Sequence, residues 1–244
     1  MLRALIFDVD GTLADTEEVH RAAFNHAFDE LGLGWHWDES LYTELLQISG
    51  GKERLAHYWR QSHPEIKAID GSAIQETVAR IHELKTAYYE TTVNSGGVAL
   101  RPGVLKLIEE ALSKGLRLAI ATTTSPVNIA ALLRAAMGSY WQHNFAAIGD
   151  ASSAPIKKPN PQVYLQVLEA LKADARTCLA FEDSGNGLKA ATAAGLATLI
   201  TPTHYTRTHD FSQAMRVVPD LGGVSLADLQ GWHQNHWSGE HAAN

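Results

Sequence analysis

The start of the chain constrains the fold more than any other part of the sequence. Residues 2–7 are almost wholly apolar, as in a strand that is buried on both faces of a parallel sheet. This run ends in two acids, Asp8 and Asp10, which are followed by Gly11 and Thr12. Ligands bind outside the carboxyl ends of the strands in open parallel sheets, so the two acids indicate a functional site.

Helix and strand patterns alternate in the second half of the chain. Buried strands are predicted at residues 116–121, 145–148, 177–181 and 197–200. Helices are predicted to start near Pro102 and Val127 and to cover residues 161–171 and 187–194. This β-α-β rhythm predicts an α/β fold with a parallel, doubly wound sheet.

A helical segment interrupts this pattern directly after the first strand. From residue 16 to about 93, apolar side chains recur at helical spacing. We therefore expect a core of residues 1–15 and 96–232, with an inserted α-helical cap of residues 16–95. The polar tail, residues 233–244, is expected to be flexible and frayed. Turn signals divide the cap into about four helices, at Gly32–Gly34, Gly50–Gly51, His63–Pro64 and Gly71.

Charge and composition narrow the range of partners. The 244 residues carry a net charge of −7, which disfavours binding to nucleic acid and to anionic membranes, because both attract a basic surface. No apolar run approaches the ~18 residues of a membrane span, and Asp8 comes too early for a signal peptide. A single cysteine, Cys178, suits a reducing compartment. We expect a cytoplasmic monomer that acts on a small molecule.

Polar residues suited to phosphoryl transfer follow the other predicted strands. Glu182 and Asp183 come after the fourth strand, and Lys158 is expected to open the helix before that strand. Carboxylates and phosphate oxygens are ligands of Mg²⁺, and an aspartate can attack phosphorus to form an aspartyl-phosphate. A second aspartate can act as general acid and then as base, while hydroxyls and a lysine hold the phosphoryl oxygens. The hydroxyls follow the second strand, at Thr122, Thr123, Thr124 and Ser125.

Four motifs in this order resemble those of the haloacid dehalogenase-like phosphatases. Residues 8–13 match the first motif, DxDGT, and the other three are similar at Thr122, at Lys158 before Pro159, and at Glu182–Asp183–Ser184. The resemblance covers essentially residues 1–210 and implies a Rossmann-like core. The insertion resembles the cap of the subgroup that holds β-phosphoglucomutase and phosphoglycolate phosphatase. Within that subgroup, the chain resembles CbbY-type sugar-phosphate phosphatases, which dephosphorylate xylulose 1,5-bisphosphate, at four segments: residues 16–20, 50–54, 121–125 and 201–206.

The resemblance implies a role for each matching residue. Asp8 is the nucleophile and a Mg²⁺ ligand, and Asp10 is the acid and base and offers its backbone carbonyl to the metal. Thr122 and Lys158 bind the transferring phosphate. The metal site is completed by Asp183, with Glu182 beside it. Substrate contacts are implied for Glu17, His20, Gly50, Gly51, Lys52, Glu53, Arg54, Thr123, Thr124 and Ser125.

Plainer interpretations stay open for several of these residues. The hydroxyls at 122–125 can be a helix N-cap, Gly50–Gly51 can be a turn, and His20 can be partly exposed. Lys52 and Arg54 can be solvated; otherwise they hold the uncleaved phosphate of a bisphosphate. We expect Lys157 to be solvated, Cys178 to be a core residue, and three histidines to lie in the tail: His233, His236 and His241.

Other functions remain as alternatives. A phosphoglucomutase-like enzyme would pass the phosphoryl group from Asp8 to a second sugar phosphate. A broad-specificity monophosphatase or phosphoglycolate phosphatase would need only one phosphate. A non-catalytic binding protein would not need Asp8 and Asp10 together. Residues 185–190 fit a dinucleotide fingerprint, but the acids before them would repel a pyrophosphate, and that fingerprint belongs after the first strand.

Overall fold

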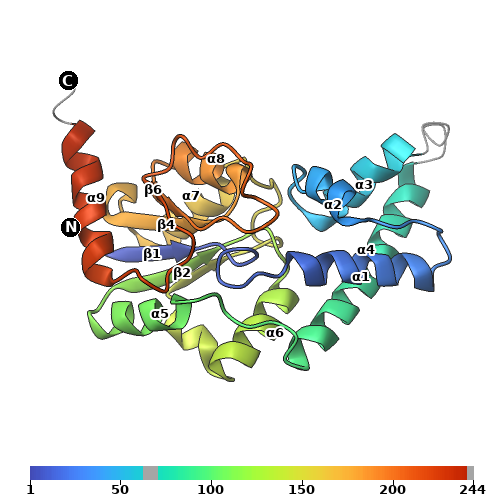
Figure 1. Ribbon diagram of the computed structural model, residues 1–244, viewed down its shortest axis with the longest axis horizontal. Helices are drawn as coiled ribbons and strands as arrows, with labels where there is room; N and C mark the ends of the chain where they lie inside the picture. Colours follow the sequence, from blue (N-terminus) through green and yellow to red (C-terminus); the bar gives the residue numbers. More distant parts are fainter. Residues whose placement is uncertain (63–70, 241–244) are drawn as a thin grey trace.

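The structure, a computed structural model, describes residues 1–62 and 71–240 and contains a six-stranded sheet with helices on both faces (Figure 1). The strand order is β3-β2-β1-β4-β5-β6, and every neighbouring pair is parallel. The predicted doubly wound α/β fold is therefore confirmed. The strands are β1 (Ala4–Phe7), β2 (Arg117–Ala121), β3 (Ala147–Gly149), β4 (Cys178–Glu182), β5 (Ala197–Ile200) and β6 (Arg216–Val217).

Side chains that alternate along the strands give the sheet a hydrophobic layer on each face. Phe7 and Phe181 stack on one face, with ring centroids 4.5 Å apart. Ile6 and the buried Cys178 belong to the layer on the other face. The first layer includes residues of α5 (Val104–Ser113), α6 (Pro126–Met137) and α9 (Leu226–Glu240), and the second includes residues of α7 (Gln162–Leu171) and α8 (Gly185–Ala193).

The first four helices after β1 form a helical insertion, defined here as α1 to α4. It lies beyond the carboxyl ends of the strands (Figure 1), and in the described parts of residues 16–95 it has the four helices expected. The insertion has its own aromatic core, where Trp37 packs against Phe24 and Phe28 at centroid distances of 4.7 and 5.0 Å. The turn signal His63–Pro64 lies outside the described residues. The helices are α1 (Glu17–Glu30), α2 (Glu39–Leu45), α3 (Gly51–Ser62) and α4 (Gly71–Asn94).

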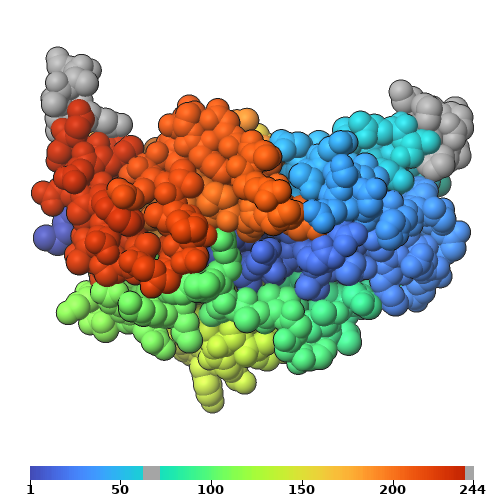
Figure 2. Space-filling view, in the orientation of Figure 1, coloured from blue at the N-terminus to red at the C-terminus, as the bar shows by residue number. Residues whose placement is uncertain are grey.

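The chain enters the insertion and returns from it at neighbouring points, where its two connecting segments pair with each other. Ala14 forms an antiparallel bridge with Leu100, and the backbone N–H of Arg101 donates to the carbonyl of Leu13 at 2.8 Å. The Arg101 guanidinium also donates to the carbonyls of Gly11 and Thr201, which ties the loop after β1 to the loop after β5. Figure 2 shows the orange chain that follows β5 lying against the blue helices of the insertion.

The flexible tail predicted from residue 233 is wrong as far as Glu240, because α9 extends to that residue. His233 is buried, and the indole N–H of Trp237 donates to its Nε2 at 3.1 Å. Trp232 and Trp237 pack against the hydrophobic layer of the sheet, so aromatic side chains order this polar helix. His241 lies outside the described residues.

Two other local expectations need correction. The helix expected to include Pro102 begins at Val104, because Gly103 adopts a left-handed backbone conformation before it. Lys158 lies in the turn before α7 and not on the helix, which begins at Gln162. Among residues 1–62 and 71–240, no helix is both long and apolar enough to cross a membrane.

Candidate active site

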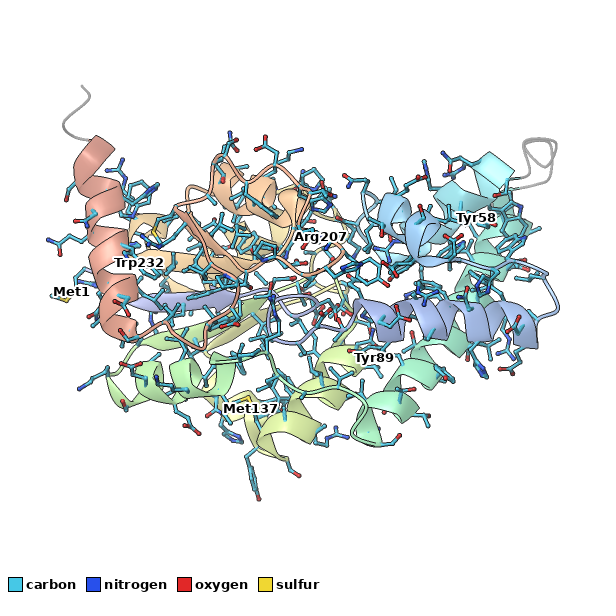
Figure 3. All side chains as sticks on the ribbon, in the orientation of Figure 1. Met1, Tyr58, Tyr89, Met137, Arg207 and Trp232 are labelled. Carbon is cyan, nitrogen blue, oxygen red and sulfur yellow. The ribbon has the colours of Figure 1, made fainter. Side chains whose placement is uncertain are left out.

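A cavity of about 390 Å³ lies at the carboxyl ends of the strands, between the sheet and the helical insertion. In Figure 3, side chains from the insertion and the core meet in this region, with Arg207 labelled on the core side. The cavity wall includes every residue expected at the site except Glu182, which is fully buried beneath it. The strand order changes direction between β1 and β4, which is where such sheets bind ligands.

Lys158 holds two acids from different strands together at the floor of the cavity. Its Nζ donates to Asp8 Oδ1 at 2.7 Å, to Glu182 Oε1 at 2.6 Å and to the carbonyl of Ala121 at 2.9 Å. Tyr164 of α7 donates to the same Glu182 oxygen at 2.6 Å. Burial raises the pKa of Asp8 to about 7 against the opposing charge of Lys158. The two acids outweigh the effect of burial on Lys158 and hold its pKa above the usual value.

Three carboxylates at this floor could hold a metal ion. Asp8, Glu182 and Asp183 offer oxygens that lie within 4.8 Å of one another. Only one lysine, Lys158, pairs with the group among the described residues, so negative charge is in excess. Burial raises the pKa of Asp183 well above its usual value, and the charges of Glu182 and Asp8 raise it further. An all-oxygen, acidic set of this kind fits Mg²⁺.

Two glycines leave room for these carboxylates. A Cβ on Gly187 would lie 1.8 Å from Glu182 Oε2, and a Cβ on Gly11 would lie 2.3 Å from Asp183 Oδ2. Glu182 Oε2 is buried and has no hydrogen-bond partner in the described part of the chain. Burial of an unpaired carboxylate oxygen is costly, and a cation at this point would satisfy it.

Asp10 faces the helical insertion instead of the other acids. Its Oδ1 accepts a hydrogen bond from Thr16 at 2.7 Å and lies 3.0 Å from Nε2 of His20. On the other side of the ring, Nζ of Lys85 lies 2.6 Å from Nδ1 of His20. A lysine ammonium can only donate, so His20 accepts at Nδ1 and donates at Nε2 to Asp10.

The environment of Asp10 favours its ionised form. Burial opposes ionisation, but hydrogen bonds from His20 and Thr16, together with the charge of Lys85, outweigh it and lower the pKa of Asp10. Burial lowers the pKa of Lys85 to about 8. Sequence reasoning missed Lys85, although it lies four residues from both Ile81 and Tyr89 in the buried stripe of α4.

A buried polar cluster in the insertion forms another wall of the cavity. The Tyr42 hydroxyl donates to Glu17 Oε2 at 2.8 Å and accepts from Nη1 of Arg54 at 3.2 Å. Nε of Arg54 donates to the carbonyl of Leu45 at 3.1 Å. Arg54 is therefore buried and held, not solvated, and the missed residue that holds it is Tyr42.

The outer part of the cavity combines residues of both parts of the chain. Gly50 has a φ of +93°, and Lys52 and Glu53 follow it at the start of α3 as exposed side chains. The expectation of a solvated Lys157 is wrong: this residue is half-buried in the wall and donates to the carbonyl of Ala151 at 2.9 Å. His82, also missed, lines the cavity, and burial together with the charges of Lys85 and Lys52 lowers its pKa to about 3.

The hydroxyl cluster after β2 includes the helix N-cap that the sequence allowed. Ser125 is the N-cap of α6 and accepts from the backbone N–H of Asn128 at 3.3 Å. Thr124 accepts from the side-chain amide of Asn128 at 3.1 Å, and Thr122 is buried beside the acids. These residues and Thr123 all line the cavity.

Comparisons with known proteins assign the chain to a family. Residues 2–195 match the family model of the haloacid dehalogenase-like hydrolases. The chain belongs to this family. The hydrolase is 52% identical over 248 residues to the plasmid protein CbbY of Cupriavidus necator, across 95% of this chain and 97% of that protein.

Solved structures of CbbY have the same architecture as this hydrolase. CbbY from Rhodobacter sphaeroides in complex with phosphate is 42% identical, with a TM-score of 0.86, across 94% of this chain and 100% of that one. A mutant of that CbbY in complex with xylulose 1,5-bisphosphate has the same identity and TM-score, across 94% of this chain and 99% of that one. The expected family, its CbbY-type branch and the class of enzyme, a haloacid dehalogenase-like phosphatase, are confirmed.

Proposed function

We propose that this hydrolase is a Mg²⁺-dependent phosphatase that cleaves a small sugar bisphosphate through an aspartyl-phosphate on Asp8. The first candidate substrate is xylulose 1,5-bisphosphate, the compound bound in the related CbbY structure. The observation that carries the proposal is the position of Asp8, which lies among two further carboxylates and one buried lysine at the end of the cavity.

Asp8 is suited to attack on phosphorus. One of its oxygens, Oδ1, is held by Lys158 at 2.7 Å, which fixes the orientation of the carboxylate. The other oxygen can form the bond to phosphorus while the bond to the sugar oxygen breaks. Thr122 and Lys158 would hold oxygens of the transferring group, since both line the cavity beside Asp8. In the second step water attacks the aspartyl-phosphate, which releases phosphate and restores Asp8.

Asp10 would move the proton in both steps. In the first step it gives a proton to the departing sugar oxygen, and in the second it takes one from water. Its ionised resting form suits the second step directly. For the first step Asp10 must be protonated, and the hydrogen bond from His20 Nε2 is a route by which a proton can reach it. Lys85 on the far side of His20 fixes the orientation of that ring.

The metal site would use Asp8, Glu182 and Asp183, with the backbone carbonyl of Asp10 as a further ligand. The structure fits a hard divalent cation here because all three side chains are carboxylates and one buried oxygen, Glu182 Oε2, is unpaired among the described residues. When bound, Mg²⁺ would supply positive charge that keeps Asp8 ionised and offsets the charge of the transferring group.

The uncleaved phosphate would bind at the wall formed by the insertion, which we propose acts as a cap of residues 16–95 over a core of residues 1–15 and 96–232. Arg54 is buried in this wall, and Lys52 and the Gly50–Gly51 turn line the cavity next to it. Arginine can bind phosphate with two parallel hydrogen bonds, and lysine adds a compact charge. The expectation of a cytoplasmic monomer stays a prediction.

A phosphate-release assay over sugar monophosphates and bisphosphates, with Mg²⁺ or with chelator, tests the proposed function. We expect release of phosphate from xylulose 1,5-bisphosphate only with Mg²⁺. Equal efficiency on monophosphates would indicate a broad-specificity monophosphatase. Accumulation of an isomeric sugar phosphate without free phosphate would indicate a mutase.

A further inference from the structure

One aromatic side chain from outside the helical insertion lies inside the hydrophobic core of that insertion. Tyr205 belongs to the loop after β5, yet it is 5% exposed and packs in the cluster that includes Phe24, Trp37 and Leu55. The other buried residues of this cluster all come from the insertion. Figure 2 shows the orange chain of this region against the blue helices. The loop therefore joins the core to the packing of the insertion.

Tyr205 is fixed at both ends of its side chain. Its hydroxyl donates to Glu18 Oε2 at 2.6 Å, and Glu18 in turn accepts from Nε of Arg21 at 3.0 Å. Its ring meets the ring of Tyr42 edge to face, at a centroid distance of 5.7 Å and an angle of 85°. Such edge-to-face contacts have a preferred geometry, so a fixed Tyr205 constrains the position of Tyr42.

Tyr42 connects this contact to the cavity. The Tyr42 ring is fully buried, its hydroxyl bridges Glu17 and Arg54, and the Arg54 guanidinium lies 5.2 Å from the ring centroid. Glu17 and Arg54 both line the cavity, whereas Tyr205 does not. A shift of the Tyr42 ring would therefore move the two charged groups that face the substrate.

We propose that Tyr205 is a positioning residue for substrate specificity: through its edge-to-face contact with Tyr42 it holds Glu17 and Arg54 in the geometry that binds the uncleaved phosphate. This inference rests on the proposed function. The inference gives the loop after β5, which belongs to the core domain, a part in recognising the uncleaved phosphate that the cap contacts. Because Tyr205 touches neither Asp8 nor the other acids of the floor, its effect is confined to substrates that carry a second phosphate.

The test compares two substrates in the full-length, Mg²⁺-loaded enzyme. The bisphosphate preference is defined as kcat/KM for xylulose 1,5-bisphosphate divided by kcat/KM for p-nitrophenyl phosphate, which lacks a second phosphate. Tyr205→Leu keeps apolar volume in the cluster but removes the ring contact, and it should lower the preference by about tenfold or more. The loss should appear in kcat as well as in KM for the bisphosphate. Tyr205→Phe keeps the ring and should retain the preference within about twofold.

His204→Ala is the matched control, because His204 precedes Tyr205 and meets Glu39 of the insertion at the exposed rim, 2.5 Å away. This variant should keep the wild-type preference. A double-mutant cycle gives a second test: in an Arg54→Ala background, Tyr205→Leu should lower the preference little further, since the two residues act on the same contact.

Each other outcome overturns the inference. A Tyr205→Leu enzyme with unchanged preference, or with equal losses on both substrates, would show that Tyr205 has no role in reading the second phosphate. Fully additive losses with Arg54→Ala would do the same. A wild-type enzyme without any bisphosphate preference would instead overturn the proposed specificity itself, and that result is seen before any variant is measured.

Discussion

Nζ of Lys85 lies 2.6 Å from Nδ1 of His20, and Nε2 of the same ring lies 3.0 Å from Oδ1 of Asp10. The three side chains form a continuous hydrogen-bonded chain that runs from the buried Lys85 of α4 to the partly buried Asp10 in the loop after β1. The His20 ring also stacks on Tyr89 at a centroid distance of 4.4 Å, which limits its rotation. The insertion thereby controls the orientation and the charge environment of Asp10, the proposed acid–base residue of the core.

Replacement of Lys85 should impair the acid–base steps. Burial lowers the pKa of Lys85 to about 8, so its charge is lost as the pH rises through that value. We expect wild-type kcat to fall above about pH 8, and Lys85→Met to lower kcat by about tenfold or more at neutral pH without that alkaline decline. Steady-state kinetics from about pH 6 to about pH 10, a range that includes the lowered pKa of Lys85, would measure both effects. Arg80→Met, exposed on the same helix, is the control. An unchanged pH profile in Lys85→Met would contradict the role.

The same residue should make stability depend on pH. The pKa of Lys85 falls from 10.5 to about 8 on folding, so the unfolded chain binds more protons than the folded chain between these values. The contribution of Lys85 to the free energy of unfolding therefore rises with pH in this window and is unfavourable below it. Lys85→Met should be more stable than wild type at pH 7, and the difference should shrink toward pH 10.5. Urea unfolding at several pH values tests this, and a constant difference would disprove it.

Asp8→Asn should abolish turnover while the fold is retained. The amide is a poor nucleophile, so we expect kcat to fall about a thousandfold or more. Lys158 keeps Glu182 as a partner at 2.6 Å, so the far-UV spectrum and Tm should change little. The exposed Asp15→Asn, a few residues along the same loop, should be fully active. Substantial activity in purified Asp8→Asn would exclude the aspartyl-phosphate.

Removal of the metal should silence the enzyme reversibly. Chelator-treated protein should release no phosphate, and Mg²⁺ should restore activity, because Lys158 alone leaves the acidic floor with an excess of negative charge. Mg²⁺ should also raise Tm, since a ligand at a hundred times its Kd adds about 2.7 kcal/mol to the free energy of unfolding. Glu182→Gln should lose both responses. Zn²⁺ should not substitute, since the three side chains are all carboxylates. Full activity in chelator would refute the metal site.

The wild-type enzyme should prefer a ketopentose bisphosphate to its monophosphate, and Arg54→Ala and Lys52→Ala should reduce that preference. One charge-assisted hydrogen bond is worth about 1.5–3 kcal/mol, so a loss of about tenfold to a hundredfold in kcat/KM is expected. Both kcat and KM should change if the remote phosphate helps to assemble the site. Arg60→Ala, exposed on the same helix α3, should behave as wild type. Equal losses on both substrates would contradict the assignment.

The sheet could be predicted because each inner strand is a short apolar run with polar residues at its carboxyl end. That rule placed Asp8, Thr122 and Asp183 at one edge, where the structure has them. It could not find β6, whose two residues are exposed and therefore have no apolar signal. It also failed for α9, a polar segment that is ordered by the packing of separated tryptophans against the core.

The missed residues of the site come from helices, whose orientation depends on tertiary packing. Tyr42, His82 and Lys85 reach the cavity region because α2 and α4 pack around the aromatic core of the insertion. Of these, Lys85 had a detectable signal, since a charged residue stood in the apolar stripe of α4. The role of Tyr42 depends on contacts with residues 25 positions before it and 12 after it, which local pattern cannot reveal.

The bridge between Ala14 and Leu100 makes the insertion a module with a single junction. The residues that line the cavity on the helical side are encoded between these two residues, while the three carboxylates at the floor of the cavity are encoded outside them. Mutations in this one stretch of the gene can therefore alter what is recognised without disturbing how it is cleaved, provided that they spare His20 and Lys85, which hold Asp10. Grafting experiments between relatives have a natural boundary at this junction, and Tyr205 is the residue that a graft would also have to carry.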